Sequence, residues 1–128
     1  MSARPPLLEL QGVRVERGGR RVLDVPSFRL GAGEVVAVIG PNGSGKTTLL
    51  HALMGLVPRA AGRALFRGEE LDADGRIVER RRRMAMILQE SLLFDTTVEA
   101  NVAAGLKLRA TARDESRRRV ALYLERFR

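Results

Sequence analysis

The strongest chemical signal in the sequence is carried by nine consecutive residues: Gly40, Pro41, Asn42, Gly43, Ser44, Gly45, Lys46, Thr47 and Thr48. Their pattern, G-x-x-x-x-G-K-[ST], allows consecutive backbone N–H groups to surround a polyphosphate. The glycines let the main chain approach an anion with no side chain in between. Lys46 is placed to reach the β- and γ-phosphates, and the Thr47 hydroxyl to bind a magnesium ion that accompanies them. The segment predicts a nucleotide-binding loop.

The residues on either side of this loop predict the elements that position it. Val35–Ile39 is an unbroken apolar run rich in β-branched residues, which is typical of a buried parallel strand. After the loop, apolar residues recur at helical spacing: Leu49, Leu50, Leu53, Leu56 and Val57. Strand, glycine loop and helix therefore follow in the order that the motif requires. The start of the helix would add free N–H groups and a partial positive charge to the anion site.

Composition excludes several classes of function. The chain has 128 residues, enough for one domain with a core, and 45% hydrophobic residues, which is normal for a folded protein. It has no cysteine and one histidine, so thiolate metal sites, disulfides and a Ser-His-Asp triad lack their residues. The net charge of +8 has two interpretations: arginines spread over a solvated surface, or a surface that binds nucleic acid or anionic lipid. The scarcity of aromatics among the basic runs favours the first explanation.

The N-terminus has no long apolar run of the signal-peptide kind, and no stretch is long and apolar enough to cross a bilayer. We therefore expect a cytoplasmic protein, with any role at a membrane arising through a partner. No repeat or flexible linker interrupts the sequence. Residues 1–128 are expected to form part of one domain.

A coarse reading of the chain gives the remaining elements. Leu7–Val15 and Val22–Leu30 are expected to form a hairpin through the turn at Arg17–Arg20. The helix after the glycine loop is expected to stop near Gly55–Pro58, and Gly62–Gly68 to form a short strand before a loop at Asp72–Gly75.

The last third of the chain contains one more expected strand and two expected helices. Met84–Leu88 is a second candidate for a buried strand, and Arg80–Arg83, just before it, is interpreted as a solvated helix end or strand lead-in. Thr96 with Glu99, and Thr111 with Asp114, predict helix N-caps. In the two helices, apolar residues are expected to share one face: Val98, Val102 and Leu106 in the first, and Val120, Tyr123, Leu124 and Phe127 in the second.

A second motif follows the Met84–Leu88 segment. Gln89 begins a pattern of the form Q-x-x-x-L-[FL]-x-x-x-T-V-x-x-N-V, which matches at Gln89, Leu93, Thr97, Val98, Asn101 and Val102. Together with the glycine loop, this segment resembles the Q-loop of ATP-binding cassette (ABC) ATPases. The stretches Val22–Val25 and Gly31–Glu34 also resemble the family's sequence ahead of the loop.

The resemblance implies an α/β fold of the P-loop NTPase class, present in part. It would comprise an antiparallel β-hairpin subdomain, parallel core strands with helices, and the start of a helical subdomain. It implies ATP and Mg²⁺ as ligands, phosphate binding by Gly40–Thr48, and catalytic roles for Lys46 and Gln89. Thr47 and Gln89 would approach the metal. The implied partners are membrane permease subunits and a second ATPase subunit, which would place the protein at the inner face of the cell membrane.

Two departures from the family pattern are visible. Arg17 stands where the family usually has an aromatic residue that stacks on adenine. Its guanidinium is either a substitute stacking group or a solvated turn residue. The sequence also contains no signature motif of the L-S-G-G-Q type, no apolar strand ending in Asp-Glu, and no histidine in the position of the family's switch residue. We therefore expect this chain, as the N-terminal portion of the domain, to bind nucleotide without hydrolysing it, because the general base is missing.

Leu92–Thr97 and Gly105–Arg109 resemble bacterial importer ATPases of the tungstate, molybdate or phosphate kind. Two other functions stay open. One is a soluble ATPase of the same family that acts on nucleic acid or the ribosome. The other is a non-catalytic basic module that binds phosphate. Non-specific nucleic-acid binding would fall steeply with salt, whereas nucleotide binding would depend on magnesium and Lys46.

Overall fold

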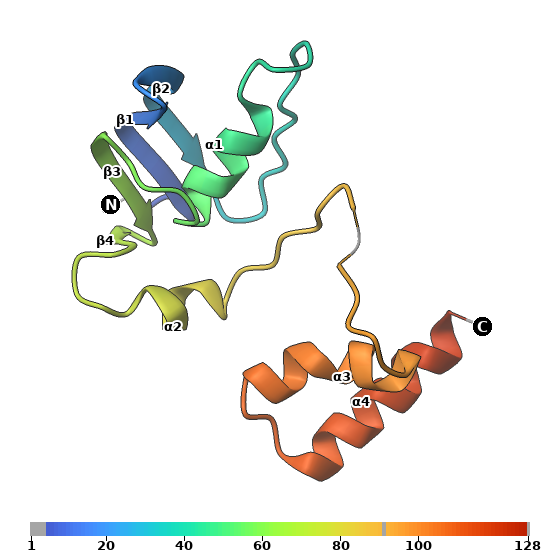
Figure 1. Ribbon diagram of the computed structural model, residues 1–128. Coiled ribbons are helices and arrows are strands. Elements are labelled where there is room, and N and C mark those ends of the chain that lie inside the picture. The colour runs from blue at the N-terminus through green and yellow to red at the C-terminus, as the bar shows by residue number, and fades with distance from the viewer. Residues whose placement is uncertain (1–4, 91, 128) are drawn as a thin grey trace. The chain divides into compact units, whose positions relative to one another are not determined.

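The computed structural model describes residues 5–90 and 92–127, which form two compact units, Met1–Met84 and Ala85–Arg128 (Figure 1). The first unit contains a four-stranded sheet, the glycine loop and two helices. The second contains two further helices. None of the described helices has the length and apolar character needed to cross a bilayer.

The sheet of the first unit is antiparallel, with strand order β2-β1-β3-β4. Its strands are β1 (Leu8–Arg17), β2 (Arg20–Leu30), β3 (Ala61–Phe66) and β4 (Glu69–Glu70). The turn between β1 and β2 contains Gly18 and Gly19, both with positive φ (55° and 71°), as a tight hairpin turn requires. The predicted hairpin is confirmed, and so is the strand expected within Gly62–Gly68.

A bend in β1 explains why its sequence alternates only loosely. Leu10 and Val13 are both fully buried although they are three positions apart, a spacing that would place them on opposite faces of a regular strand. Between them, Gly12 adopts a left-handed conformation (φ 58°), and the register with β3 shifts between Gln11 and Arg14. This irregularity returns the strand's apolar residues to the same face of the sheet.

The helix α1 (Lys46–Leu53) packs its apolar side on that face. The resulting core consists of Leu10, Val13, Val15, Leu49, Ala52, Leu53, Ala64, Phe66 and Leu71. The helix ends just before Gly55, close to the predicted stop. The core therefore holds α1, and with it the end of the glycine loop, against the hairpin.

The prediction of two buried strands is wrong for this structure. Val35–Ile39 and Met84–Leu88 belong to no sheet, and most of their residues are exposed: Val35 is 95% exposed and Ile87 96%. A parallel strand obtains its hydrogen bonds and its burial from neighbouring strands. Within the described chain, all four strands pair with one another in the antiparallel sheet, so these two segments have no neighbour.

The arginine run is only partly solvated, in contrast to its interpretation from the sequence. Arg80 and Arg81 end the short helix α2 (Ile77–Arg81), and Arg80 is buried at 7% exposure. Its guanidinium donates to both carboxylate oxygens of Asp74, at 2.5 and 3.0 Å, and to Glu69 at 3.0 Å. The Arg83 guanidinium lies over the Phe66 ring, 5.2 Å from its centroid.

In the second unit, α3 (Val98–Leu108) packs against α4 (Arg113–Arg126). The N-caps differ from those predicted. The cap of α3 is Thr97, whose Oγ1 accepts a hydrogen bond from the Ala100 N–H at 3.1 Å, and not Thr96. The cap of α4 is Ala112, which makes no side-chain capping bond, and not Thr111.

The expected apolar faces of α3 and α4 are only partly buried. Val98, Tyr123 and Phe127 remain exposed, whereas Leu106, Val120 and Leu124 are half-buried. Asn101, within α3, uses its side chain to bind the backbone of the segment that precedes the helix. Its Oδ1 accepts from the Phe94 N–H at 2.8 Å, and its Nδ2 donates to the carbonyls of Phe94 and Thr97.

Candidate functional site

The glycine loop connects the extended Val35–Ile39 segment to α1. Gly43 and Gly45 have left-handed conformations, with φ of 81° and 93°, which L side chains rarely adopt. A Cβ added to Gly45 would lie 3.0 Å from the carbonyl oxygen of Val22 in β2. A Cβ added to Gly43 would meet only open space. Gly45 is thus required by the close approach to the hairpin, while both glycines permit the turn.

Lys46 folds back across the loop that precedes it. Its Nζ donates hydrogen bonds to the carbonyl oxygens of Gly40 and Pro41, each at 2.7 Å. These bonds hold the ammonium group against the first residues of the loop. An ammonium group has three donor hydrogens, so two bonds leave one N–H for a ligand.

The first turn of α1 offers further donors. Gly45 is the helix N-cap, and no side chain accepts a hydrogen bond from this turn in the described structure. The N–H groups at the start of a helix have no intrahelical acceptor, and the helix dipole adds partial positive charge there. The turn contains Lys46, Thr47 and Thr48, and Thr47 is exposed. Backbone donors, a cation and a hydroxyl therefore occur within three residues.

A hollow of about 270 Å³ lies beside the loop. It is lined by Leu23, Val38, Ile39, Gly40, Pro41, Ser44, Gly45, Lys46 and Leu49. The motif predicted the loop residues but not Leu23 and Leu49. Leu23 comes from β2, so its place here depends on the hairpin packing, which no local pattern reveals.

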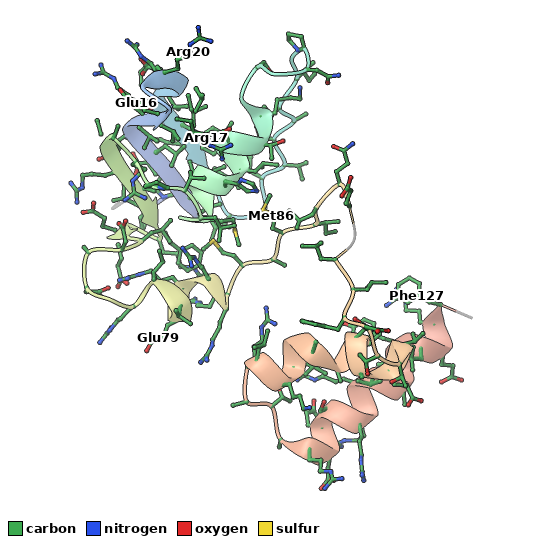
Figure 2. The ribbon with its side chains drawn as sticks, in the orientation of Figure 1. Glu16, Arg17, Arg20, Glu79, Met86 and Phe127 are labelled. Carbon is green, nitrogen blue, oxygen red and sulfur yellow. The ribbon has the colours of Figure 1, made fainter. Side chains whose placement is uncertain are left out.

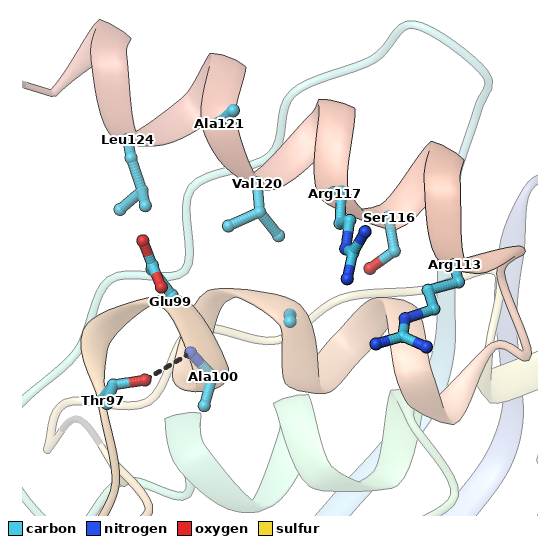
Figure 3. A pocket seen from close by; sticks show the side chains of 10 residues that line it. Thr97, Glu99, Ala100, Arg113, Ser116, Arg117, Val120, Ala121 and Leu124 are labelled. Carbon is cyan, nitrogen blue, oxygen red and sulfur yellow. Dashed lines mark hydrogen bonds between the residues drawn. The ribbon is translucent and has the colours of Figure 1, made fainter.

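A larger hollow, of about 600 Å³, lies between α3 and α4 (Figure 3). Its lining includes Glu99, Arg113, Arg117, Val120 and Leu124. Size alone would favour it as a site. Its lining contains the Glu99 carboxylate and no glycine or lysine, whereas the smaller hollow borders the glycine loop and Lys46, so the chemistry favours the smaller hollow for a phosphate ligand.

The two other predicted site residues lie apart from the loop in sequence. Arg17 is exposed at the end of the β1–β2 hairpin, next to the turn that leads to Arg20 (Figure 2). Gln89 is exposed in the second unit, in the segment that follows Leu88. The first unit therefore brings Arg17 and the complete glycine loop into one body, while Gln89 belongs to the other.

No cluster of three or more acidic, histidine or cysteine side chains that could hold a metal occurs in residues 5–90 and 92–127. The oxygen donors available at the loop are neutral, and the Thr47 hydroxyl is exposed. Magnesium is commonly held by substrate phosphates and water with only one or two protein ligands. A loop of this composition fits a metal that arrives with a phosphate ligand.

Comparison with known proteins agrees with the motif. The sequence model of the family described as "ABC transporter" matches residues 23–128. The Fe(3+) ions import ATP-binding protein FbpC of Streptomyces coelicolor is 41% identical over 94% of this chain and 34% of its own length. The sulfate/thiosulfate import ATP-binding protein CysA of Bordetella bronchiseptica is 39% identical over 88% of this chain and 31% of its own. The chain thus spans about a third of these relatives.

Solved structures give the same result. The chain resembles cbiO1 from Clostridium perfringens, described as part of the ABC transporter complex cbiONQ, with a TM-score of 0.78 and 28% identity. That match covers 95% of this chain and 50% of the solved one. The match includes both units and confirms the P-loop NTPase fold class.

Proposed function

Because this chain belongs to the ABC transporter family, we propose that its glycine loop, Gly40–Thr48, binds the triphosphate of Mg-ATP. The observation that carries the proposal is the combination at one helix N-terminus of two left-handed glycines, uncapped N–H groups and the folded-back Lys46 ammonium. Each supplies positive potential or a hydrogen-bond donor to an anion.

The residues have separate proposed roles. Main-chain N–H groups of Gly43–Thr48 would hold the phosphates, and Lys46 would donate its remaining N–H to the β- and γ-phosphates. Thr47 would provide a hydroxyl to Mg²⁺, whose positive charge offsets that of the phosphates. Gln89 would contribute its side-chain amide to the metal and γ-phosphate. Arg17 would stack its guanidinium on the base.

In the whole protein, we propose that this part powers transport as the nucleotide-binding subunit of an ABC importer. Permease subunits and a second ATPase subunit would complete the assembly at the inner face of the membrane. Hydrolysis needs a carboxylate that polarises the attacking water, and no Asp-Glu strand follows Gln89 in this sequence. We therefore expect the 128-residue chain to bind ATP with negligible turnover.

The cargo would be recognised by other subunits. An oxyanion of the tungstate, molybdate or phosphate kind is proposed from the resemblance of Leu92–Thr97 and Gly105–Arg109. The sulfate/thiosulfate relative belongs to that chemical class, whereas the Fe(3+) relative does not.

Calorimetric titration with Mg-ATP tests the proposal. The chain offers a matched pair of variants because its only two lysines are Lys46, in the loop, and Lys107, exposed on α3. We expect Lys46→Ala to weaken binding about 100-fold, because charge-assisted bonds to phosphate are lost, and Lys107→Ala to leave it unchanged. EDTA should also weaken binding.

Two results would contradict binding of Mg-ATP by the loop. One is equal binding by the two lysine variants. The other is affinity that depends on salt but not on magnesium, which would favour the basic phosphate-binding module, whose contacts with nucleic acid release counterions. ATP hydrolysis by the pure chain, abolished by Lys46→Ala, would contradict the expectation of negligible turnover.

A further inference from the structure

The C-terminal end of α1, the helix that follows the glycine loop, is capped by a glycine. Gly55 has a left-handed conformation with φ of 62°. Its N–H donates to the Ala52 carbonyl at 3.0 Å, and the Leu56 N–H donates to the His51 carbonyl at 2.8 Å. This arrangement satisfies two of the carbonyls at the end of α1.

Two more carbonyls at this end are bound by a side chain from α2. Arg81 donates from Nε to the carbonyl oxygen of Met54 at 3.0 Å and from a terminal nitrogen to that of Gly55. A planar guanidinium that makes two bonds fixes both the position and the orientation of its acceptors. Arg81 therefore holds the end of α1 in a defined direction.

The helix that carries Arg81 is itself fixed. Its neighbour Arg80 is buried and binds Asp74 and Glu69, so α2 is attached to the β3–β4 end of the sheet. Ile77 of α2 packs so closely that a Cβ added to Gly55 would lie 3.0 Å from its Cδ1. Arg81 thus connects α1 to an anchored element.

Because α1 is short and rigid, its orientation at the C-terminal end determines where its N-terminal end, next to the glycine loop, lies. With eight residues the helix is about 12 Å long, so a tilt of about 10° moves one end by about 2 Å relative to the other. Misplacement by about 1 Å is enough to weaken precisely oriented interactions severely. We propose that Arg81 is a positioning residue for the glycine loop: by holding the C-terminal end of α1, it sets where Lys46 and the first-turn N–H groups lie. This inference rests on the proposed function of the loop.

The test compares four forms of the 128-residue chain: wild type, Arg81→Ala, Arg81→Lys, and Arg126→Ala as a charge-matched control exposed in the last turn of α4. Affinity for Mg-ATP is measured by calorimetry well below the unfolding midpoint. Nuclear magnetic resonance of the nucleotide-free forms records the amide signals of Gly45 and Lys46.

We expect Arg81→Ala to weaken Mg-ATP binding about tenfold and Arg81→Lys about threefold, because one ammonium group restores the charge but not the two-bond geometry. Arg126→Ala should remain within about twofold of wild type. The Gly45 and Lys46 signals should move in Arg81→Ala, while those of the β1–β2 turn stay in place. A purely structural role would lower the unfolding midpoint without these changes in the folded protein.

Wild-type affinity in both Arg81 variants, with unmoved Gly45 and Lys46 signals, would overturn the inference. Full recovery by Arg81→Lys would also overturn it, because charge at the helix end would then suffice. If Arg81→Ala does not fold, Arg81→Lys decides by the same criteria. If the wild type binds no Mg-ATP, the proposed function fails, and the nucleotide-free signals still decide whether Arg81 positions the loop.

Discussion

At the scale of single residues, the Arg80–Asp74 pair links charge to stability. The Arg80 side chain is 8% exposed, and its hydrogen bonds, together with one from the Arg76 N–H, hold the pKa of Asp74 well below its ordinary value of 3.8. A carboxyl group whose pKa is lowered by folding stabilises the folded state at any pH above its pKa in the unfolded chain. This contribution is lost as the pH falls towards its pKa in the folded protein.

We therefore expect Asp74→Asn to lower the unfolding midpoint by about 5 °C at neutral pH, because the buried Arg80 guanidinium loses one of its two carboxylate partners and keeps only Glu69. The difference from wild type should persist down to pH near 3.8 and shrink progressively below it, because Asp74 then takes up a proton in the unfolded chain well before it does so in the folded protein. Thermal melts followed by circular dichroism across this range provide the measurement. Asp95→Asn, at an exposed loop position, is the control; a difference from wild type that does not change with pH would contradict the argument.

The place of a side chain can be predicted from sequence where it follows from local spacing. Lys46 stands six residues after Gly40, and the structure places its ammonium group on the carbonyls of Gly40 and Pro41. Arg80 could not be interpreted in this way. Its partners, Glu69 and Asp74, are brought to it by the path of the β4–α2 loop, so the charge run alone suggested a solvated end.

At the scale of elements, the contact between β1 and β3 depends on a glycine. Gly62 has φ of 84°, and a Cβ there would lie 2.3 Å from the Gly12 carbonyl oxygen. We expect Gly62→Ala to destabilise the first unit by about 3 kcal/mol, from backbone strain and from displacement of the strands. Gly75→Ala is the matched control, because φ there is 75° and a Cβ would meet open space.

That control should cost about 1 kcal/mol, which is the strain alone. Urea unfolding of both variants gives the comparison. Equal losses of stability would show that the close approach of Gly62 to β1 adds nothing.

The elements that could be predicted are those stabilised by residues close to them in the sequence. The β1–β2 hairpin joins adjacent strands through Gly18 and Gly19, and both features are visible in sequence. The segment Val35–Ile39 has the composition of a strand, but a parallel strand exists only beside another strand. The predicted N-cap of α3 was wrong by one residue. Thr96 and Thr97 both suit an N-cap, and the hydrogen bond from the Ala100 N–H is made to Thr97.

At the scale of the whole molecule, apolar residues in both units remain exposed where no sheet covers them. In the first unit, Val35 and Ile39 are 95% and 93% exposed, and in the second, Leu92 and Leu93 are also largely exposed. An extended β-branched segment with unpaired main-chain groups is a template for pairing with another chain.

The last prediction follows from that surface. We expect the isolated chain to aggregate, and Val35→Lys to raise the concentration at which aggregates form about tenfold, because a charge interrupts the exposed strand-like run. Val78→Lys is the matched control: Val78 is also exposed, but it lies in α2, where helical hydrogen bonds occupy the backbone. Light scattering over a concentration series measures the onset. If Val78→Lys suppresses aggregation as strongly as Val35→Lys, net charge and not the 35–39 segment controls association, and a cooperative melt from a wild-type monomer would contradict the expectation itself.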